Sequence, residues 1–246
     1  MKVSSLTLLA ALLLPMTAQS AELKVLAGGS LTASLKELAP KFEQATGHKL
    51  DIVFAATPDL VRMATSAPFD AGVVPIDVMR NAQARATLAA AEPITIARIG
   101  FGVAVRAGAP KPDISTAVAF RTALLQARSI ALLPESAAGA YVLKVFDRLG
   151  IADAMKQKTL AQTSPAAIAQ AVANGEAELG VFLTNVLIAP GVEPVGPFPG
   201  DLQQDLVLVG AIAKDARAAQ AAQALLAFLT TSEAVAVFRQ KGVTPP

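Results

Sequence analysis

A Gly-Gly-Ser turn carries the first residues with binding chemistry. Gly29 and Ser30 follow a predicted strand at 23–26 and precede a predicted helix. The backbone N–H groups at a helix start carry partial positive charge, and the serine hydroxyl adds a donor, so this turn can bind an anion. The turn has neither the spacing of a P-loop nor that of a dinucleotide-binding loop. Ser30 as a simple helix cap is the alternative.

A second turn of the same kind lies at 134–141, with the sequence PESAAGAY. It offers the hydroxyl of Ser136, the backbone N–H groups of Ala138 and Gly139, and the phenol of Tyr141. A strand is predicted before it and a helix after it. Two such turns, one on each side of a cleft, are what binding of a small anion requires.

Composition excludes several classes of site. The 246 residues include no Cys and one His, His48, so disulfides, thiolate chemistry and multi-histidine metal sites are excluded. We expect neither a metal nor another cofactor. The 21 Lys and Arg nearly balance the 19 Asp and Glu, which argues against nucleic acid as a partner.

Strands and helices must alternate to position these turns. This alternation predicts an α/β fold with mostly parallel sheets and helices on both faces. Strands are predicted at 23–26, 49–54, 71–74, 94–106, 129–133, 179–183 and 206–213. Helices are predicted at 31–46, 59–66, 75–91, 116–127, 139–149, 165–174, 215–229 and 232–241.

The first twenty residues have the features of a secretory signal peptide. Lys2 precedes an apolar run at 6–14, and small residues follow near 18–20. The alternative is a membrane anchor, but nine apolar residues are too short for the bilayer core, which requires about 20. We therefore expect a cleaved signal at 1–20, a periplasmic protein and a monomer.

The remaining chain is predicted to form two lobes. Lobe 1 is expected to comprise 21–97 plus 203–246, and lobe 2 to comprise 98–202. The chain would cross between them in the long strand zone at 94–106 and in the proline-rich segment at 190–205. A single doubly wound domain is the alternative that the pattern leaves open.

Several segments resemble the periplasmic molybdate-binding protein family. The similarity is carried by SLTASLKELAPKFEQATGH at 30–48, GVAVRAG at 102–108, AGAY at 138–141 and GEAELGV at 175–181. The family comprises type II solute-binding proteins that serve ATP-driven importers. The resemblance implies a two-lobed α/β fold, each lobe a mixed, mostly parallel sheet flanked by helices, with a ligand cleft between the lobes and a membrane permease as partner.

The resemblance also implies which residues bind the anion. Ser30 matches the family's first hydroxyl, Thr57 is the candidate for the second, and the Ala138 N–H matches a backbone donor. The chain departs from the family at two positions. Pro165 stands where another N–H donor is expected, and Leu183 stands where a tyrosine is expected, which favours a small anion other than molybdate, such as an organic acid.

An enzyme on the same scaffold is the alternative function. Some proteins related to this family are periplasmic isomerases of aconitate, and moving a proton along a tricarboxylate requires a general base and carboxylate anchors. The candidates for proton transfer are Glu135, Asp77 and Tyr141. Arg80 or Arg106 would anchor carboxylates.

Overall fold

The computed structural model describes residues 20–89 and 91–246. The predicted signal peptide therefore lies outside the described residues, apart from Ser20. One half of the molecule is built on three parallel strands, with β1 between β2 and β3. These are β1 (Glu22–Gly28), β2 (Lys49–Ala55) and β3 (Ala71–Pro75). Parallel strands end at the same edge of the sheet, so the turn that follows β1 lies beside the turn that follows β2.

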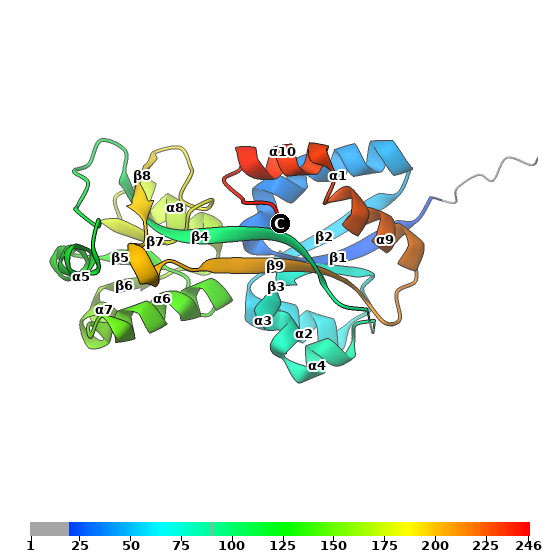
Figure 1. Cartoon of the computed structure of the whole chain (residues 1–246), viewed down its shortest axis with the longest axis horizontal. Coiled ribbons are helices and arrows are strands. Elements are labelled where there is room, and N and C mark those ends of the chain that lie inside the picture. The colour runs from blue at the N-terminus through cyan, green and yellow to red at the C-terminus, as the bar shows by residue number, and fades with distance from the viewer. Residues whose placement is uncertain (1–19, 90) are drawn as a thin grey trace, which may run out of the picture.

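Helices cover both faces of this first sheet (Figure 1). On one face lie α1 (Thr32–Thr46), α9 (Ala219–Phe228) and α10 (Ser232–Gln240). On the other lie α2 (Thr57–Ser66), α3 (Ile76–Arg80) and α4 (Ala82–Ala86). Helix α1 buries Leu35, Leu38 and Phe42, whose spacing places them on one helical face.

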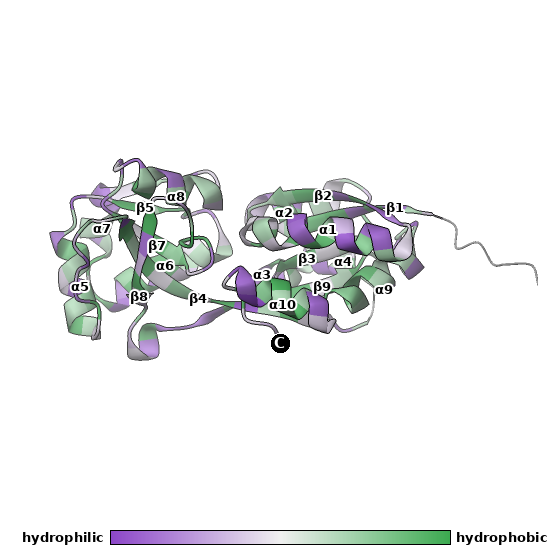
Figure 2. Ribbon diagram, turned by 90° about the horizontal axis from the view of Figure 1, so that it is seen from above, coloured by the Kyte–Doolittle hydropathy of each residue, from purple (hydrophilic) through white to green (hydrophobic). Residues whose placement is uncertain are grey.

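The other half is built on β5, which pairs in parallel with both β6 and β7. Its strands are β5 (Ile130–Leu132), β6 (Thr159–Ala161) and β7 (Leu179–Leu183). Its helices are α5 (Ala117–Gln126), α6 (Ala137–Arg148), α7 (Ala152–Lys158) and α8 (Pro165–Ala173). Figure 2 shows the apolar residues of both halves concentrated on the strands and on the helix sides that face them.

Two long strands join the halves. Strand β4 (Ile94–Arg106) pairs with β9 (Asp205–Ile212) as far as Gly100, and with β7 and β8 (Val192–Pro197) from Phe101 onward. The sheet order is β2-β1-β3-β9-β4-β7-β5-β6, and β9 also pairs with β3. We call the half with β1, β2, β3 and β9 lobe 1, and the half with β5, β6 and β7 lobe 2.

The prediction of a two-lobed α/β fold is confirmed. The residue boundaries proposed for the lobes stay a prediction. The single helix expected at 75–91 is wrong. Asn81 adopts an extended backbone conformation between α3 and α4, and its side chain accepts a hydrogen bond from the Ala84 N–H, so it ends one short helix and caps the next.

The helix expected at 215–229 begins only at Ala219. Residues 214–218 form a turn in which the buried Asp70 carboxylate accepts hydrogen bonds from the N–H groups of Arg217 and Ala218. In the described part of the chain, no single helix has the length and apolar composition needed to cross a membrane. The bent pair α9 and α10 meets that test only when the two helices are taken together.

Candidate ligand-binding cleft

The predicted binding turns meet at a small cavity between the lobes. The ends of β1 and β2 in lobe 1 face the starts of α6 and α8 in lobe 2 across a space of about 30 Å³, which is room for about two water molecules. We call this space the central cavity. Of the predicted ligand-binding residues, it is lined by Gly29, Ser30, Thr57, Ser136 and Ala138.

Three contacts hold the lobes together around the central cavity. The Ala137 N–H donates to Thr57 Oγ1, with 3.1 Å between the two atoms. The Asn185 side-chain N–H donates to the Ser30 carbonyl oxygen at 2.7 Å. Gly29 packs so closely on Pro165 that a Cβ at Gly29 would lie 3.3 Å from the proline Cγ. Apart from Asn185, the residues that make these contacts also line the central cavity.

Some hydrogen-bond donors at the start of α6 stabilise the helix cap, and one remains free at the cavity. Ser136 caps the helix, since its hydroxyl accepts from the Gly139 N–H at 2.9 Å and donates to the Leu133 carbonyl oxygen at 2.9 Å. The Ala138 N–H lies in the first turn, where no intrahelical acceptor exists, and no other described residue accepts its hydrogen bond. Ala138 is thus the α6 residue whose N–H is free for a ligand.

Gly139 has a structural reason to be glycine. A Cβ at this position would lie 1.8 Å from the Leu133 carbonyl oxygen. Gly139 does not line the central cavity described above, and its N–H is used by the cap. The absence of a side chain is what allows α6 to start so close to the end of β5.

Ser30 does not act as a helix cap. No side chain caps α1, and the Ser30 hydroxyl forms no hydrogen bond with another described residue. It lines the central cavity together with the Ala138 N–H, one donor from each lobe. Both donors of this pair are available to a ligand.

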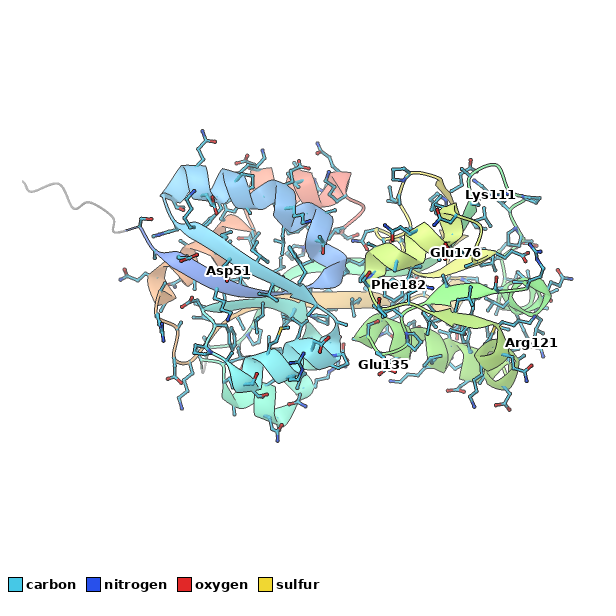
Figure 3. The ribbon with its side chains drawn as sticks, turned by 180° about the vertical axis from the view of Figure 1, so that it is seen from behind. Asp51, Lys111, Arg121, Glu135, Glu176 and Phe182 are labelled. Atoms are coloured by element: carbon cyan, nitrogen blue, oxygen red, sulfur yellow. The ribbon has the colours of Figure 1, made fainter. Side chains whose placement is uncertain are left out.

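Most of the remaining lining of the central cavity is apolar. The apolar lining includes Pro165 and Leu183, next to Leu133, Phe182 and Leu206. Pro165 and Leu183 are the two positions at which this chain departs from the molybdate-binding protein family. Pro165 is the first residue of α8, where proline is favoured because its missing N–H is not needed by the helix. The cavity therefore offers a bound group a few hydrogen-bond donors within a mostly hydrocarbon lining. In Figure 3, Phe182 and Glu135 lie where the two lobes face each other.

A larger space adjoins the central cavity next to Thr57 and Ser136. This charged arm has a volume of about 450 Å³. Its polar lining includes Asp77, Arg80, Glu135, Tyr141, Lys144 and Asp205. The structure thus brings together the predicted candidates Asp77, Arg80, Glu135 and Tyr141, and adds Lys144, which lies one helical turn after Tyr141 on α6.

Tyr141 is held as a hydrogen-bond donor. Its phenol donates to the Leu202 carbonyl oxygen at 2.9 Å, and its ring packs on Phe101. Burial raises the pKa of the Tyr141 phenol, so the group stays protonated near neutral pH. Arg80 pairs with Asp77 at 3.1 Å. The other candidate anchor, Arg106, lies at the end of β4 beside Gly175 and lines neither the central cavity nor the charged arm.

A second large space adjoins the central cavity next to Gly29 and Ser30. This apolar arm has a volume of about 700 Å³ and is lined by residues of both lobes. Its apolar lining includes Phe54, Met63, Ala166, Val186, Ile188 and Pro190. The sequence analysis did not predict it. Its lining comes from three helices, a strand end and the loop after β7, and no motif links those segments.

The comparison with protein families assigns residues 23–244 to the bacterial extracellular solute-binding proteins. The chain belongs to this family. It is 33% identical over 232 residues to an aconitate isomerase from a Pseudomonas species, covering 91% of this chain and 87% of that protein. It is 30% identical over 235 residues to the molybdate-binding protein ModA of Azotobacter vinelandii, covering 94% and 92%.

Solved structures agree on the fold. The periplasmic molybdate-binding protein of Azotobacter vinelandii superposes with a TM-score of 0.75 at 20% identity, covering 91% of this chain and 99% of that one. The sulfate-binding protein SubI of Mycobacterium tuberculosis superposes with a TM-score of 0.74 at 16% identity, covering 92% and 87%. The family member described here therefore has the two-lobed fold of the periplasmic binding proteins, as the sequence motifs predicted.

Proposed function

We propose that this family member is a periplasmic solute-binding protein that delivers one small organic anion to the permease of an ATP-driven importer. The observation that carries the proposal is the pair of free donors in the central cavity, the Ser30 hydroxyl from lobe 1 and the Ala138 N–H from lobe 2. An anion between them bonds to both lobes at once, which stabilises the closed arrangement. Neutral donors of this kind bind an anion without a lysine or arginine.

The mostly apolar lining of the cavity favours a carboxylate over a metal oxyanion. A tetrahedral oxyanion exposes oxygens in every direction, and those that face Pro165 and Leu183 would find no donor there. An unpaired buried acceptor costs about 1–3 kcal/mol. A carboxylate has only two oxygens, and the rest of the molecule can be hydrocarbon, which matches a cavity with few donors and a mostly apolar lining.

A thermal-shift panel tests this proposal. The purified protein is heated with acetate, lactate, molybdate, tungstate and sulfate, each over a range of concentrations. A ligand present at a hundred times its Kd raises the free energy of unfolding by about 2.7 kcal/mol, so a genuine ligand gives a clear concentration-dependent rise in Tm. We expect a carboxylate to give the rise and Ser30→Ala to reduce it. Stabilisation by molybdate alone would overturn the proposed ligand class.

An isomerase of a tricarboxylate is the second candidate function. It is favoured by the gathering of Glu135, Tyr141, Arg80 and Lys144 in the charged arm, and by the aconitate isomerase among the relatives. Glu135 would act as general base, and the two cations would bind carboxylates. It ranks second because Arg80 is already paired with Asp77 and because acids outnumber bases in the arm.

Proton exchange distinguishes the two candidates. The protein is incubated with aconitate in deuterated water, and the carbon-bound hydrogens are followed by NMR. An isomerase that moves a proton between carbons incorporates deuterium, and Glu135→Gln removes the exchange. A binding protein incorporates none. Exchange that Glu135→Gln abolishes would replace the transport proposal.

A further inference from the structure

We infer that the anion has an uncharged, apolar body and that this body lies in the apolar arm of the cleft. The inference rests on the proposed function, since it requires an organic anion in the central cavity. It adds the chemical class of the ligand, a monocarboxylate with an aliphatic or aromatic body. It also assigns the walls of the apolar arm as the residues that select it.

The apolar arm adjoins the anion site. Gly29, Ser30, Ala55, Ala56 and Pro165 line both the central cavity and the arm. A carboxylate held by Ser30 and Ala138 therefore lies beside the arm, and its carbon chain would enter the arm where the close contact between Gly29 and Pro165 now forms part of the shared wall. The central cavity alone, at about 30 Å³, has no room for such a body.

The lining of the apolar arm matches an uncharged group. Phe54 and Met63 of lobe 1 face Ala166, Val186 and Ile188 of lobe 2 across it. The lining contains no Lys or Arg, and its one carboxylate, Asp59, is paired with Arg62 at 2.7 Å. An apolar body in this space would remove hydrocarbon of both lobes from water, which favours both binding and closure.

The charged arm argues against further carboxylates on the ligand. Its lining has three acids, Asp77, Glu135 and Asp205, against two bases, Arg80 and Lys144. The pairing of Arg80 with Asp77 leaves two carboxylates and one ammonium group. A second carboxylate placed there meets an excess of like charge. The remainder of the ligand is therefore better accommodated on the apolar side.

Calorimetric titration of an alkanoate series tests the inference. Acetate, butyrate, hexanoate and benzoate are titrated into the wild-type protein. Each methylene that becomes buried raises affinity roughly fourfold, so we expect hexanoate to bind at least about tenfold more tightly than acetate. Equal affinity for acetate and hexanoate would overturn the inference and leave the proposed function intact. Failure of every carboxylate to bind would overturn both.

Two matched tryptophan variants locate the body of the ligand. Ala166 is an exposed alanine on α8 that lines the apolar arm, and Ala227 is an exposed alanine on α9 that lines none of the three spaces. Ala166→Trp fills part of the arm and should remove the advantage of hexanoate over acetate, while Ala227→Trp should retain it. An advantage that survives in Ala166→Trp would show that the body lies elsewhere.

A third variant is needed if Ala166→Trp weakens the binding of acetate as well as that of hexanoate. Met63→Gln keeps the length of the side chain but makes the wall of the arm polar. We expect it to reduce the hexanoate advantage severalfold with little change for acetate. An unchanged advantage would overturn the inference, as would tighter binding of aconitate than of hexanoate, since that result would place the ligand in the charged arm.

Discussion

The Thr57 hydroxyl accepts a hydrogen bond from the Ala137 N–H across the cleft, with 3.1 Å between Oγ1 and N. Thr57 is the first residue of α2 in lobe 1, and Ala137 is the first residue of α6 in lobe 2. The bond therefore connects two helix starts of different lobes, and any separation of the lobes at this point would break it. Its loss favours the open form.

Thr57→Val removes this acceptor while keeping the shape of the side chain. A hydrogen bond of this kind contributes about 0.5–1.5 kcal/mol, so we expect ligand affinity to fall roughly two- to tenfold. Small-angle scattering of the ligand-free variant should show a larger radius of gyration. Thr57→Ser keeps the hydroxyl and serves as the control. Identical scattering from the Val variant and the wild type would show that this bond does not hold the lobes.

Asn185 makes the second interlobe bond, and a negative charge introduced at this position should weaken anion binding. Its side-chain N–H donates to the Ser30 carbonyl oxygen at 2.7 Å, and its Oδ1 is buried without a partner among the described residues. Asn185→Asp replaces the donor with a carboxylate oxygen that faces a carbonyl oxygen. We expect this variant to bind the anion at least about tenfold more weakly at neutral pH and to recover partly at low pH, when a protonated carboxyl donates again.

Titration calorimetry at two pH values checks the Asn185 prediction. Asn185→Ala is the control, since it removes the donor without adding charge. Its affinity should be lower than that of the wild type and should differ little between the two pH values, apart from any change that the wild type also shows. A partial recovery at low pH in both variants would contradict the electrostatic explanation.

Gly139→Ala should be strongly destabilising. The added Cβ would lie 1.8 Å from the Leu133 carbonyl oxygen, so the start of α6 must move away from β5. We expect the free energy of unfolding to fall by more than about 2 kcal/mol, as measured by urea unfolding. Gly72→Ala is the matched control, because its Cβ comes no closer than 3.7 Å to Val74. Equal stabilities of the two variants would mean that the start of α6 adapts freely.

Glu178 should make stability depend on acidity. Its carboxylate accepts from the Arg128 backbone N–H and from the Arg128 Nε–H, each at 3.0 Å, and the backbone bond is the main reason that the pKa of Glu178 lies below its usual range. A carboxyl with a lowered folded-state pKa stabilises the protein above its unfolded pKa. That stability is lost as pH falls through the folded pKa.

Glu178→Gln tests this pH dependence. The side chain is 39% exposed, so solvent screening limits the effect at neutral pH to less than about 1 kcal/mol. Urea unfolding should show the variant less stable than the wild type at pH 7, with the difference shrinking toward pH 3. Glu176→Gln is the control, because among the described residues the Glu176 carboxylate accepts a hydrogen bond only from the Asn174 side chain. A difference that stays constant with pH would argue against the charge as its origin.

The sequence predicted the fold well because strand and helix periods were clear and because the connections are short. It also identified both turns of the cleft. It did not predict which residues of the second turn cap the helix and which remain available to a ligand. Ser136 and Gly139 form the cap of α6, whereas Ala138 keeps its N–H free. Such a division depends on where α6 begins, and the pattern placed that start two residues late.

The sequence analysis named four residues of the charged arm, but it predicted neither the presence of Lys144 in that arm nor the apolar arm. Lys144 enters the charged arm because α6 turns that face toward α3 and β9, and Val186 and Ile188 enter the apolar arm because the loop after β7 folds against α1 and α8. Both depend on how the lobes approach each other. That approach is fixed by contacts between residues far apart in the chain, such as Asn185 with Ser30.

The position of β9 has a consequence for how the chain folds. Strands β5, β6 and β7 come from one continuous segment, so lobe 2 can assemble as soon as that segment is available. The sheet of lobe 1 can be completed only later, because β9 lies between β3 and β4 and is made from residues near the C-terminal end. Until it arrives, β3, whose five residues are all buried in the final structure, presents an apolar edge without a partner. An unpaired edge of this kind favours aggregation, so we expect the folding chain to be most prone to aggregation before β9 inserts.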